Sequence, residues 1–208
     1  MEAIDVFQMP SPMKITGRKT SITNAFANSI IPVVNPTNEE VGEALQILGL
    51  SKDDLRCSYC GDRSTEWDHL RPLILKQQPT GYISEIRNLV PCCGKCNQSK
   101  GNKNWRQWIQ STAPRSPKSR GIKDLQSKVE SLEKFEKWGN CQPLDLKTMV
   151  GEDLWTSHWT KWSEICNLMK QAQEIAQKLN AAIRAAHKMA LAEKGSLNQQ
   201  SGRTGADV

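Results

Sequence analysis

The amino-acid sequence predicts a mostly helical α+β fold, in which a small module of two strands and a short helix lies between N-terminal and C-terminal helices. Three observations support this prediction. Two Cys-x-x-Cys pairs, at residues 57–60 and 93–96, enclose short runs of strand character. Residues 37–40 form a capping-box pattern that opens a helix. From residue 122 onward, apolar side chains recur at spacings of three and four.

Residues 1–54 are expected to form an N-terminal arm and a helix. Residues 1–35 are predicted to be largely irregular and mildly basic, as either an extended arm or a frayed terminus. The capping box Thr37-Asn38-Glu39-Glu40 opens a helix that Gly49 ends. We expect this helix to pack on the central module.

The central module is predicted to span residues 55–110. A first strand is expected at residues 67–73, and a turn-rich loop at 77–82 leads to a second strand at 88–91. A helix that carries Asn97 then follows. Further along, Asn104 is expected to cap a second, short helix.

Residues 111–195 are predicted to form a basic linker and a C-terminal helical region. The linker is rich in Ser, Pro and basic residues. After a first helix, the apolar pattern from Trp155 to Gly195 predicts an unbroken helix of roughly 40 residues. Such a long helix either folds back on the first C-terminal helix or pairs with a second copy in a homodimer. Residues 196–208 are predicted to be a disordered tail.

Four cysteines share one spacing and indicate a metal site. Cys57 and Cys60 form one Cys-x-x-Cys pair, and Cys93 and Cys96 form the other. Two such pairs complete the tetrahedral thiolate shell of a structural Zn²⁺ ion. Cys92 is an alternative to Cys93 as a ligand, but the two-residue spacing of Cys93 repeats that of the first pair.

The residues between and after the cysteine pairs carry the chemistry. Asp68 and His69 are adjacent on a predicted strand, so their side chains point to opposite faces and can do different tasks. Asn97 can offer a neutral oxygen to a hard cation, and Lys100 follows three residues later on the same helix face. A histidine near its ordinary pKa of about 6.5 can accept a proton at neutral pH.

These motifs together resemble the HNH endonucleases of the zinc-containing ββα-metal type. The resemblance rests on Trp67 to Leu73, Asn88 to Pro91 and Cys93 to Lys100, and it covers roughly residues 55–110. It implies divalent-metal-dependent hydrolysis of phosphodiester bonds in DNA, with one Mg²⁺ or Mn²⁺ ion stabilising charge on the phosphate and the departing 3′ oxygen. The length of the chain resembles that of stand-alone restriction-type or phage-defence nucleases.

The resemblance also assigns expected roles to single residues. Asp68 would be a ligand of the catalytic metal and His69 the general base. Asn88 would pin the loop between the strands, and Asn97 would complete the metal site. Two alternatives are a zinc-stabilised nucleic-acid-binding protein without catalysis and a nonspecific nuclease or RNase toxin. The first would leave Asp68 and His69 as polar surface residues.

The net charge and its distribution along the chain indicate the kind of binding partner. The formal net charge is +6, and residues 97–123 hold seven cations and no acidic residue. A cationic segment beside the predicted site favours contact with a phosphate backbone. Trp105 and Trp108 lie within it and are expected to be packing residues more often than base-stacking ones. The residues that we expect to contact DNA are Arg71, Lys100, Lys103 and Arg106.

The composition indicates the cellular compartment of the protein. No apolar run approaches the roughly 18 residues of a membrane span, and the N-terminus lacks a secretory pattern. Four of the seven cysteines form Cys-x-x-Cys pairs, and a disulfide framework usually has an even number of cysteines, so this usage favours a reducing compartment. We therefore expect a cytoplasmic protein without a membrane partner.

Overall fold

The computed structural model describes residues 9–201, and it confirms a mostly helical α+β fold with small two-stranded sheets. Contacts divide the chain into two compact units. One unit is residues 21–155, and the other combines residues 9–20 with residues 156–201. The boundaries expected after residues 54 and 110 both fall inside the first unit, because the helices on either side share its core.

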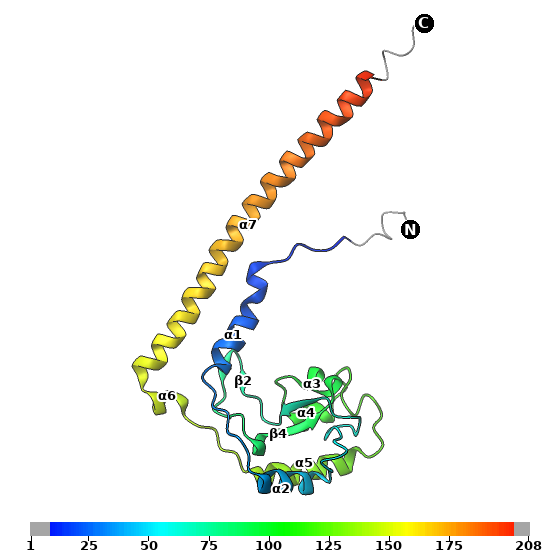
Figure 1. The fold of residues 1–208 in the computed structure, drawn as a ribbon, viewed down its shortest axis with the longest axis vertical. Helices are drawn as coiled ribbons and strands as arrows, with labels where there is room; N and C mark the ends of the chain where they lie inside the picture. The colour runs from blue at the N-terminus through cyan, green and yellow to red at the C-terminus, as the bar shows by residue number, and fades with distance from the viewer. Residues whose placement is uncertain (1–8, 202–208) are drawn as a thin grey trace. The chain divides into compact units, whose positions relative to one another are not determined.

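A strand pair followed by a short helix forms the centre of the first unit (Figure 1). Strand β1 (Glu66–His69) pairs antiparallel with β4 (Leu89–Cys92), with Asp68 opposite Val90. Helix α3 (Gly94–Lys100) follows β4 after a single residue. The ββα order therefore places the second cysteine pair at the junction of strand and helix.

The first strand is shorter than predicted. It ends at His69, and residues 70–73 of the expected strand are not in a strand. A second small hairpin follows them, in which β2 (Ile74–Leu75) pairs with β3 (Gln78–Pro79). The connecting residues Lys76 and Gln77 have positive φ angles, so the chain reverses there rather than extending.

Two helices outside the central module pack beside it. Helix α2 (Asn38–Leu48) contacts α5 (Leu125–Gly139) (Figure 1). Both helices also contact the short 3₁₀ helix η3 (Ile86–Asn88). The predicted start and end of α2 are confirmed. Thr37 and Glu40 form a reciprocal capping box, and Gly49 adopts the left-handed conformation that ends the helix.

The core of this unit is built mainly from aromatic and aliphatic side chains. Trp105 and Trp108 are each 1% exposed, so their expected role in packing is confirmed. They lie on α4 (Trp105–Ile109), whose cap is Asn104 as predicted. Tyr59 packs edge-on against Trp108, with ring centroids 5.1 Å apart. The cluster also includes Leu70, Val90, Ile109, Leu132 and Phe135.

The N-terminal segment is more ordered than expected. A 3₁₀ helix, η2 (Ile15–Arg18), leads into α1 (Lys19–Asn28), where the sequence pattern predicted an irregular arm. Thr23 and Ala27 are buried one helical turn apart, so tertiary packing stabilises a helix with a weak apolar pattern. Residues 1–8 of the expected arm lie outside the described part of the chain.

The long C-terminal helix exceeds its predicted length. A short helix, α6 (Leu146–Val150), precedes α7 (Glu152–Ser201), which continues through Gly195. The predicted end at Gly195 is therefore wrong, because one glycine costs a helix only about 1 kcal/mol. Residues 202–208 of the predicted tail lie outside the described residues. Within the described range, no helix combines the length and apolar character needed to cross a membrane.

Candidate active site

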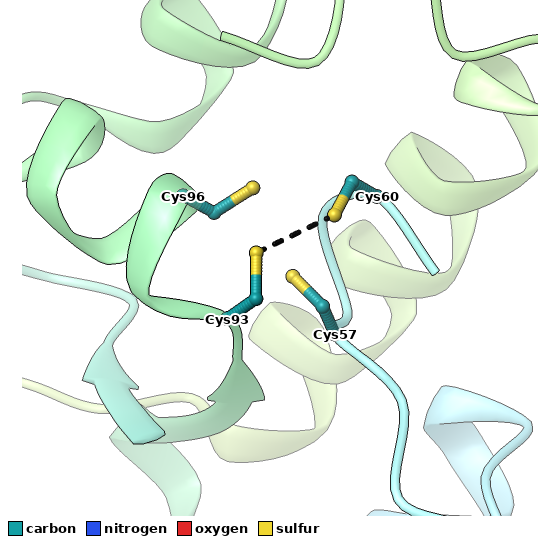
Figure 2. A group of neighbouring side chains, drawn as sticks. All are labelled: Cys57, Cys60, Cys93 and Cys96. Carbon is teal, nitrogen blue, oxygen red and sulfur yellow. Dashed lines mark hydrogen bonds between the residues drawn. The ribbon is translucent and has the colours of Figure 1, made fainter. Parts of the chain in front are cut away.

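Four cysteine side chains converge at the edge of the strand pair. The sulfur atoms of Cys57, Cys60, Cys93 and Cys96 all lie within 4.8 Å of one another, and all four residues are buried. Figure 2 shows the first two approaching from a loop and the others from the start of α3. The Cys60 and Cys93 sulfurs are 3.7 Å apart. Tetrahedral coordination with Zn–S bonds of about 2.3 Å requires sulfur spacings of about 3.8 Å, so the cluster fits zinc.

The thiols affect one another's proton affinity. Hydrogen bonds from Cys57 and Cys96 lower the pKa of Cys60, whereas the hydrogen bond to Cys60 is the main cause that raises the pKa of Cys57 to about 12. Arg120 donates to the Cys96 sulfur at 3.6 Å and to Asp62 at 2.7 Å. Arg120 therefore brings a positive charge to the Cys96 side of the cluster.

Cys92 does not belong to this cluster. It is the last residue of β4, it is fully buried, and it lies in the apolar core beside Tyr59 and Val90. Burial is the main cause that raises the pKa of its thiol. Of the two alternatives left by the sequence, the geometry selects Cys93. Cys141 and Cys166 are also buried and free.

Three of the predicted catalytic residues line one hollow of about 340 Å³. Asp68 and His69 reach it from β1, and Asn97 reaches it from α3. Trp67, which is 55% exposed, lies at the same hollow. Asn24 and Asn28 of α1 also line it. Neither asparagine was expected at the site, because the sequence pattern predicted no helix there.

Asp68 is buried and held by two donors. Its Oδ2 atom accepts a hydrogen bond from the Tyr59 hydroxyl at 2.5 Å and lies 2.9 Å from the Lys100 ammonium. Burial raises the pKa of Tyr59, so the phenol remains a proton donor. The Lys100 ammonium also donates to the backbone carbonyl of His69. One carboxylate oxygen of Asp68 is therefore fixed by protein donors.

The imidazole of His69 is half-buried and contacts Ser84. The Nε2 atom of His69 lies 2.7 Å from the Ser84 hydroxyl. Burial lowers the pKa of His69 below its ordinary value, which favours the neutral ring. The backbone of Ser84 pairs in turn with Pro32 and Val34, so the N-terminal segment supports this contact.

Asn97 is half-buried, and its side chain is bound through nitrogen. Its Nδ2 atom donates to Oε2 of Glu66 at 2.6 Å. Glu66 lies two residues before Asp68, so the alternation of a strand puts both on one face. That i, i+2 spacing of two carboxylates is the signal in the sequence that could have identified Glu66 as part of the site.

Asn88 is fully buried and bridges the loop between β1 and β4. Its Oδ1 atom accepts from the backbone N–H of Arg71 at 2.8 Å, and its Nδ2 atom donates to the carbonyls of Arg71 and Ile83. The backbone carbonyl of Asn88 accepts from Leu70. Asn88 is not among the residues that line the hollow, and its hydrogen bonds hold the loop that begins after His69.

The structure changes the expectation for the basic residues. Lys100 is fully buried, and its ammonium is paired with Asp68, so the structure does not present it as an exposed cation. Arg71 is mostly buried and pairs with Glu136. Arg106 pairs with Glu133 and Glu136 of α5. The basic segment retains Lys103, Arg115, Lys118 and Lys123 as exposed cations.

Comparison with protein families gives an independent result. A family model described as HNH endonuclease matches residues 57–103. Residues 57–103 are an HNH domain. No curated protein and no solved structure matches the chain. The family match supports a nuclease-type function in general, and it covers both cysteine pairs and the residues from Asp68 to Asn97.

Some residues of the site lie outside residues 57–103, the range of the family match. Asn24 and Asn28 line the hollow from α1, and the backbone of residues 32–34 pairs with Ser84. Helix α5 supplies Glu136, the partner of Arg71. Neighbouring segments therefore complete the surroundings of the HNH domain in this chain.

Proposed function

We propose that this protein is a divalent-metal-dependent endonuclease that hydrolyses phosphodiester bonds in DNA. The observation that carries the proposal is the meeting of Asp68, His69 and Asn97 at one hollow of an HNH domain. A carboxylate, an imidazole and an amide are the groups that metal-assisted hydrolysis requires. Asn88 holds the connecting loop behind them.

Asp68 and Asn97 are the residues that would hold Mg²⁺ or Mn²⁺. Magnesium prefers oxygen ligands and is commonly bound through one or two carboxylates together with substrate phosphates and waters. One oxygen of Asp68 is engaged by Tyr59 and Lys100, and the nitrogen of Asn97 is engaged by Glu66. The other oxygen of Asp68 and the oxygen of Asn97 are thus available to a hard cation. When bound, the ion neutralises charge on the phosphate.

His69 accepts the proton of the attacking water in this proposal. Its Nε2 atom is taken by Ser84, so Nδ1 is the nitrogen that receives the proton. Because burial lowers the pKa of His69, the ring is neutral and ready to act as a base at pH 7. Ser84 and the backbone that holds it fix the orientation of the ring.

A zinc ion held by Cys57, Cys60, Cys93 and Cys96 has a structural role in the proposal. The four thiolates fill a tetrahedral shell and leave no position for a substrate or water. Cys93 and Cys96 flank the start of the helix that carries Asn97. Zinc would therefore fix α3 relative to the 57–60 loop.

The finer biological assignment is restriction or phage defence. The chain adds helices to a small HNH domain, as stand-alone nucleases of those systems do. Exposed cations at Lys103, Arg115, Lys118 and Lys123 support a polyanionic substrate. We expect a cytoplasmic protein that acts on DNA.

A substrate panel tests the proposal. Purified protein is incubated with supercoiled plasmid, phage genomic DNA and structured RNA in Mg²⁺ or Mn²⁺, and the product ends are sequenced. Discrete DNA fragments are expected. A smear of DNA favours a nonspecific nuclease, and cleavage of RNA alone favours an RNase toxin. Zinc-loaded protein that binds DNA and cuts nothing would establish the binding protein instead.

A further inference from the structure

Glu66 is a carboxylate at the site that the mechanism above leaves without a catalytic task. It is half-buried on β1, and its Oε2 atom accepts from Asn97 Nδ2 on α3 at 2.6 Å. The contact joins the strand that carries Asp68 to the helix that carries the second candidate ligand. It is thus a direct link between the two halves of the metal site.

The chemistry of this pair defines the orientation of the amide. An ionised carboxylate only accepts hydrogen bonds, so it attracts the NH₂ group of an asparagine and repels the carbonyl oxygen. With Nδ2 directed at Glu66, the Oδ1 atom of Asn97 is turned away from the carboxylate. A cation needs that oxygen, because an amide nitrogen is not a ligand for magnesium.

The start of α3 is shaped around the same carboxylate. A Cβ atom on Gly94 would lie 2.8 Å from Oε1 of Glu66, closer than side chains approach one another. Gly94 stands between Cys93 and Cys96, within the second cysteine pair. Its lack of a side chain therefore makes room for Glu66 beside Asn97.

We propose that Glu66 is a positioning residue, which holds the Asn97 carboxamide with its oxygen available to the divalent cation. This inference rests on the proposed function and deepens it. Glu66 acts through Asn97, so its removal weakens cation binding only while Asn97 is present. Groups that orient metal ligands typically contribute about 10- to 100-fold to metal affinity or activity.

Calorimetric titration of the full-length, zinc-loaded protein with Mn²⁺ tests the proposal without a turnover assay. The variants are Glu66→Ala, Asn97→Ala and the double variant, with Asp53→Ala as a control that removes an exposed carboxylate. We expect Glu66→Ala to weaken Mn²⁺ binding by about 10- to 100-fold. The double variant should bind no more weakly than Asn97→Ala alone. Zinc content and the unfolding midpoint, measured on every variant, should stay near those of the wild type.

The Gly94→Ala variant is a second, independent test of the positioning role of Glu66. It leaves Glu66 chemically intact but places a methyl group where Oε1 lies, and Gly94 has no positive φ that would strain an alanine. We expect weaker Mn²⁺ binding with zinc retained. Glu66→Gln should fall between wild type and Glu66→Ala, because its amide can face Asn97 with either atom.

The outcomes are distinguishable. Unchanged Mn²⁺ affinity in both Glu66→Ala and Gly94→Ala would overturn the positioning role while leaving the proposed function in place. A double variant that binds Mn²⁺ far more weakly than Asn97→Ala would make Glu66 a direct ligand and also overturn it. Wild-type protein that neither binds Mn²⁺ nor cleaves DNA would remove the proposed function and this inference together.

Discussion

At the scale of single residues, the site depends on charges that are buried and paired. The Lys100 side chain is fully buried and the Asp68 side chain is 7% exposed, with 2.9 Å between the ammonium and Oδ2. Removing one member of a buried pair leaves the other charge without compensation. Lys100 therefore holds the Asp68 carboxylate in place and compensates its charge.

Lys100→Met should be strongly destabilising for this reason. We expect the free energy of unfolding to fall by about 3–5 kcal/mol, as for other broken buried pairs. Chemical denaturation measures the change, with Lys95→Met as the control because Lys95 is exposed on the same helix. Equal effects of the two substitutions would show that the Lys100 pair is not an important source of stability.

The protonation of His69 gives a pH prediction. Burial lowers the pKa of His69 below 6.5, so the base stays neutral until the pH falls below that value. The acid limb of kcat/KM should therefore have its midpoint below pH 6.5. A midpoint above pH 6.5 would mean that a different group is titrating.

Ser84→Ala should lower kcat because the His69 ring loses its hydrogen-bond partner.

At the scale of elements, the four-cysteine cluster joins the 57–60 loop to the β4–α3 junction. It lies directly before the helix residues that build the site. Arg120 extends this cluster to the segment after α4 by bonding to Cys96 and Asp62. The metal should thus stabilise several segments that have little regular structure of their own.

Adjacent cysteines allow a matched test of the zinc ligands. Cys93→Ser should lose zinc and lower the unfolding midpoint, whereas Cys92→Ser should retain zinc because Cys92 is not part of the four-sulfur cluster. Elemental analysis and thermal unfolding measure the two effects. Zinc loss in Cys92→Ser with retention in Cys93→Ser would reverse the assignment.

Elements with strong local signals were predictable from the sequence. The capping box at Thr37 and the cap at Asn104 stand where the pattern placed them, since each side chain bonds to its own helix. Helix α1 was missed because it depends on tertiary burial of Thr23 and Ala27. The hairpin at Lys76 and Gln77 was missed because neither residue is a usual one for positive φ.

Candidate site residues divided in the same way. The sequence could predict that Asp68, His69 and Asn97 meet at one hollow, because their residue types and spacing form a local motif. Ser84 and the partners of Arg71 and Lys100 were not predictable, since these contacts join residues distant in the sequence. A cationic segment in the sequence does not reveal which cations already face carboxylates in the fold.

At the scale of the whole molecule, the HNH domain shares its core with helices beyond the family match. Leu132 and Phe135 of α5 are fully buried in the cluster that contains Trp105 and Trp108. Phe135→Ala should lower the free energy of unfolding by about 3–5 kcal/mol. Glu130→Ala, an exposed change on the same helix, serves as the control. A small effect of Phe135→Ala would show that α5 is dispensable for this core.

The role of α7 is a second question at this scale. Leu168, Ile175 and Leu179 follow its helical spacing and are each at least 60% exposed. A homodimer would cover such side chains, and light scattering measures the molar mass directly. A dimer that becomes a monomer in Ile175→Lys would support pairing through α7, and a monomeric wild type would favour packing within one chain.

The most direct test of nuclease activity compares two histidine variants on supercoiled plasmid DNA in Mg²⁺. His69→Ala removes the proposed base, and His187→Ala is the control because His187 is exposed on α7. The proposed mechanism predicts cleavage by wild type and His187→Ala, and its loss in folded, zinc-loaded His69→Ala. Full cleavage by His69→Ala, or none by the wild type under any divalent metal, would contradict it.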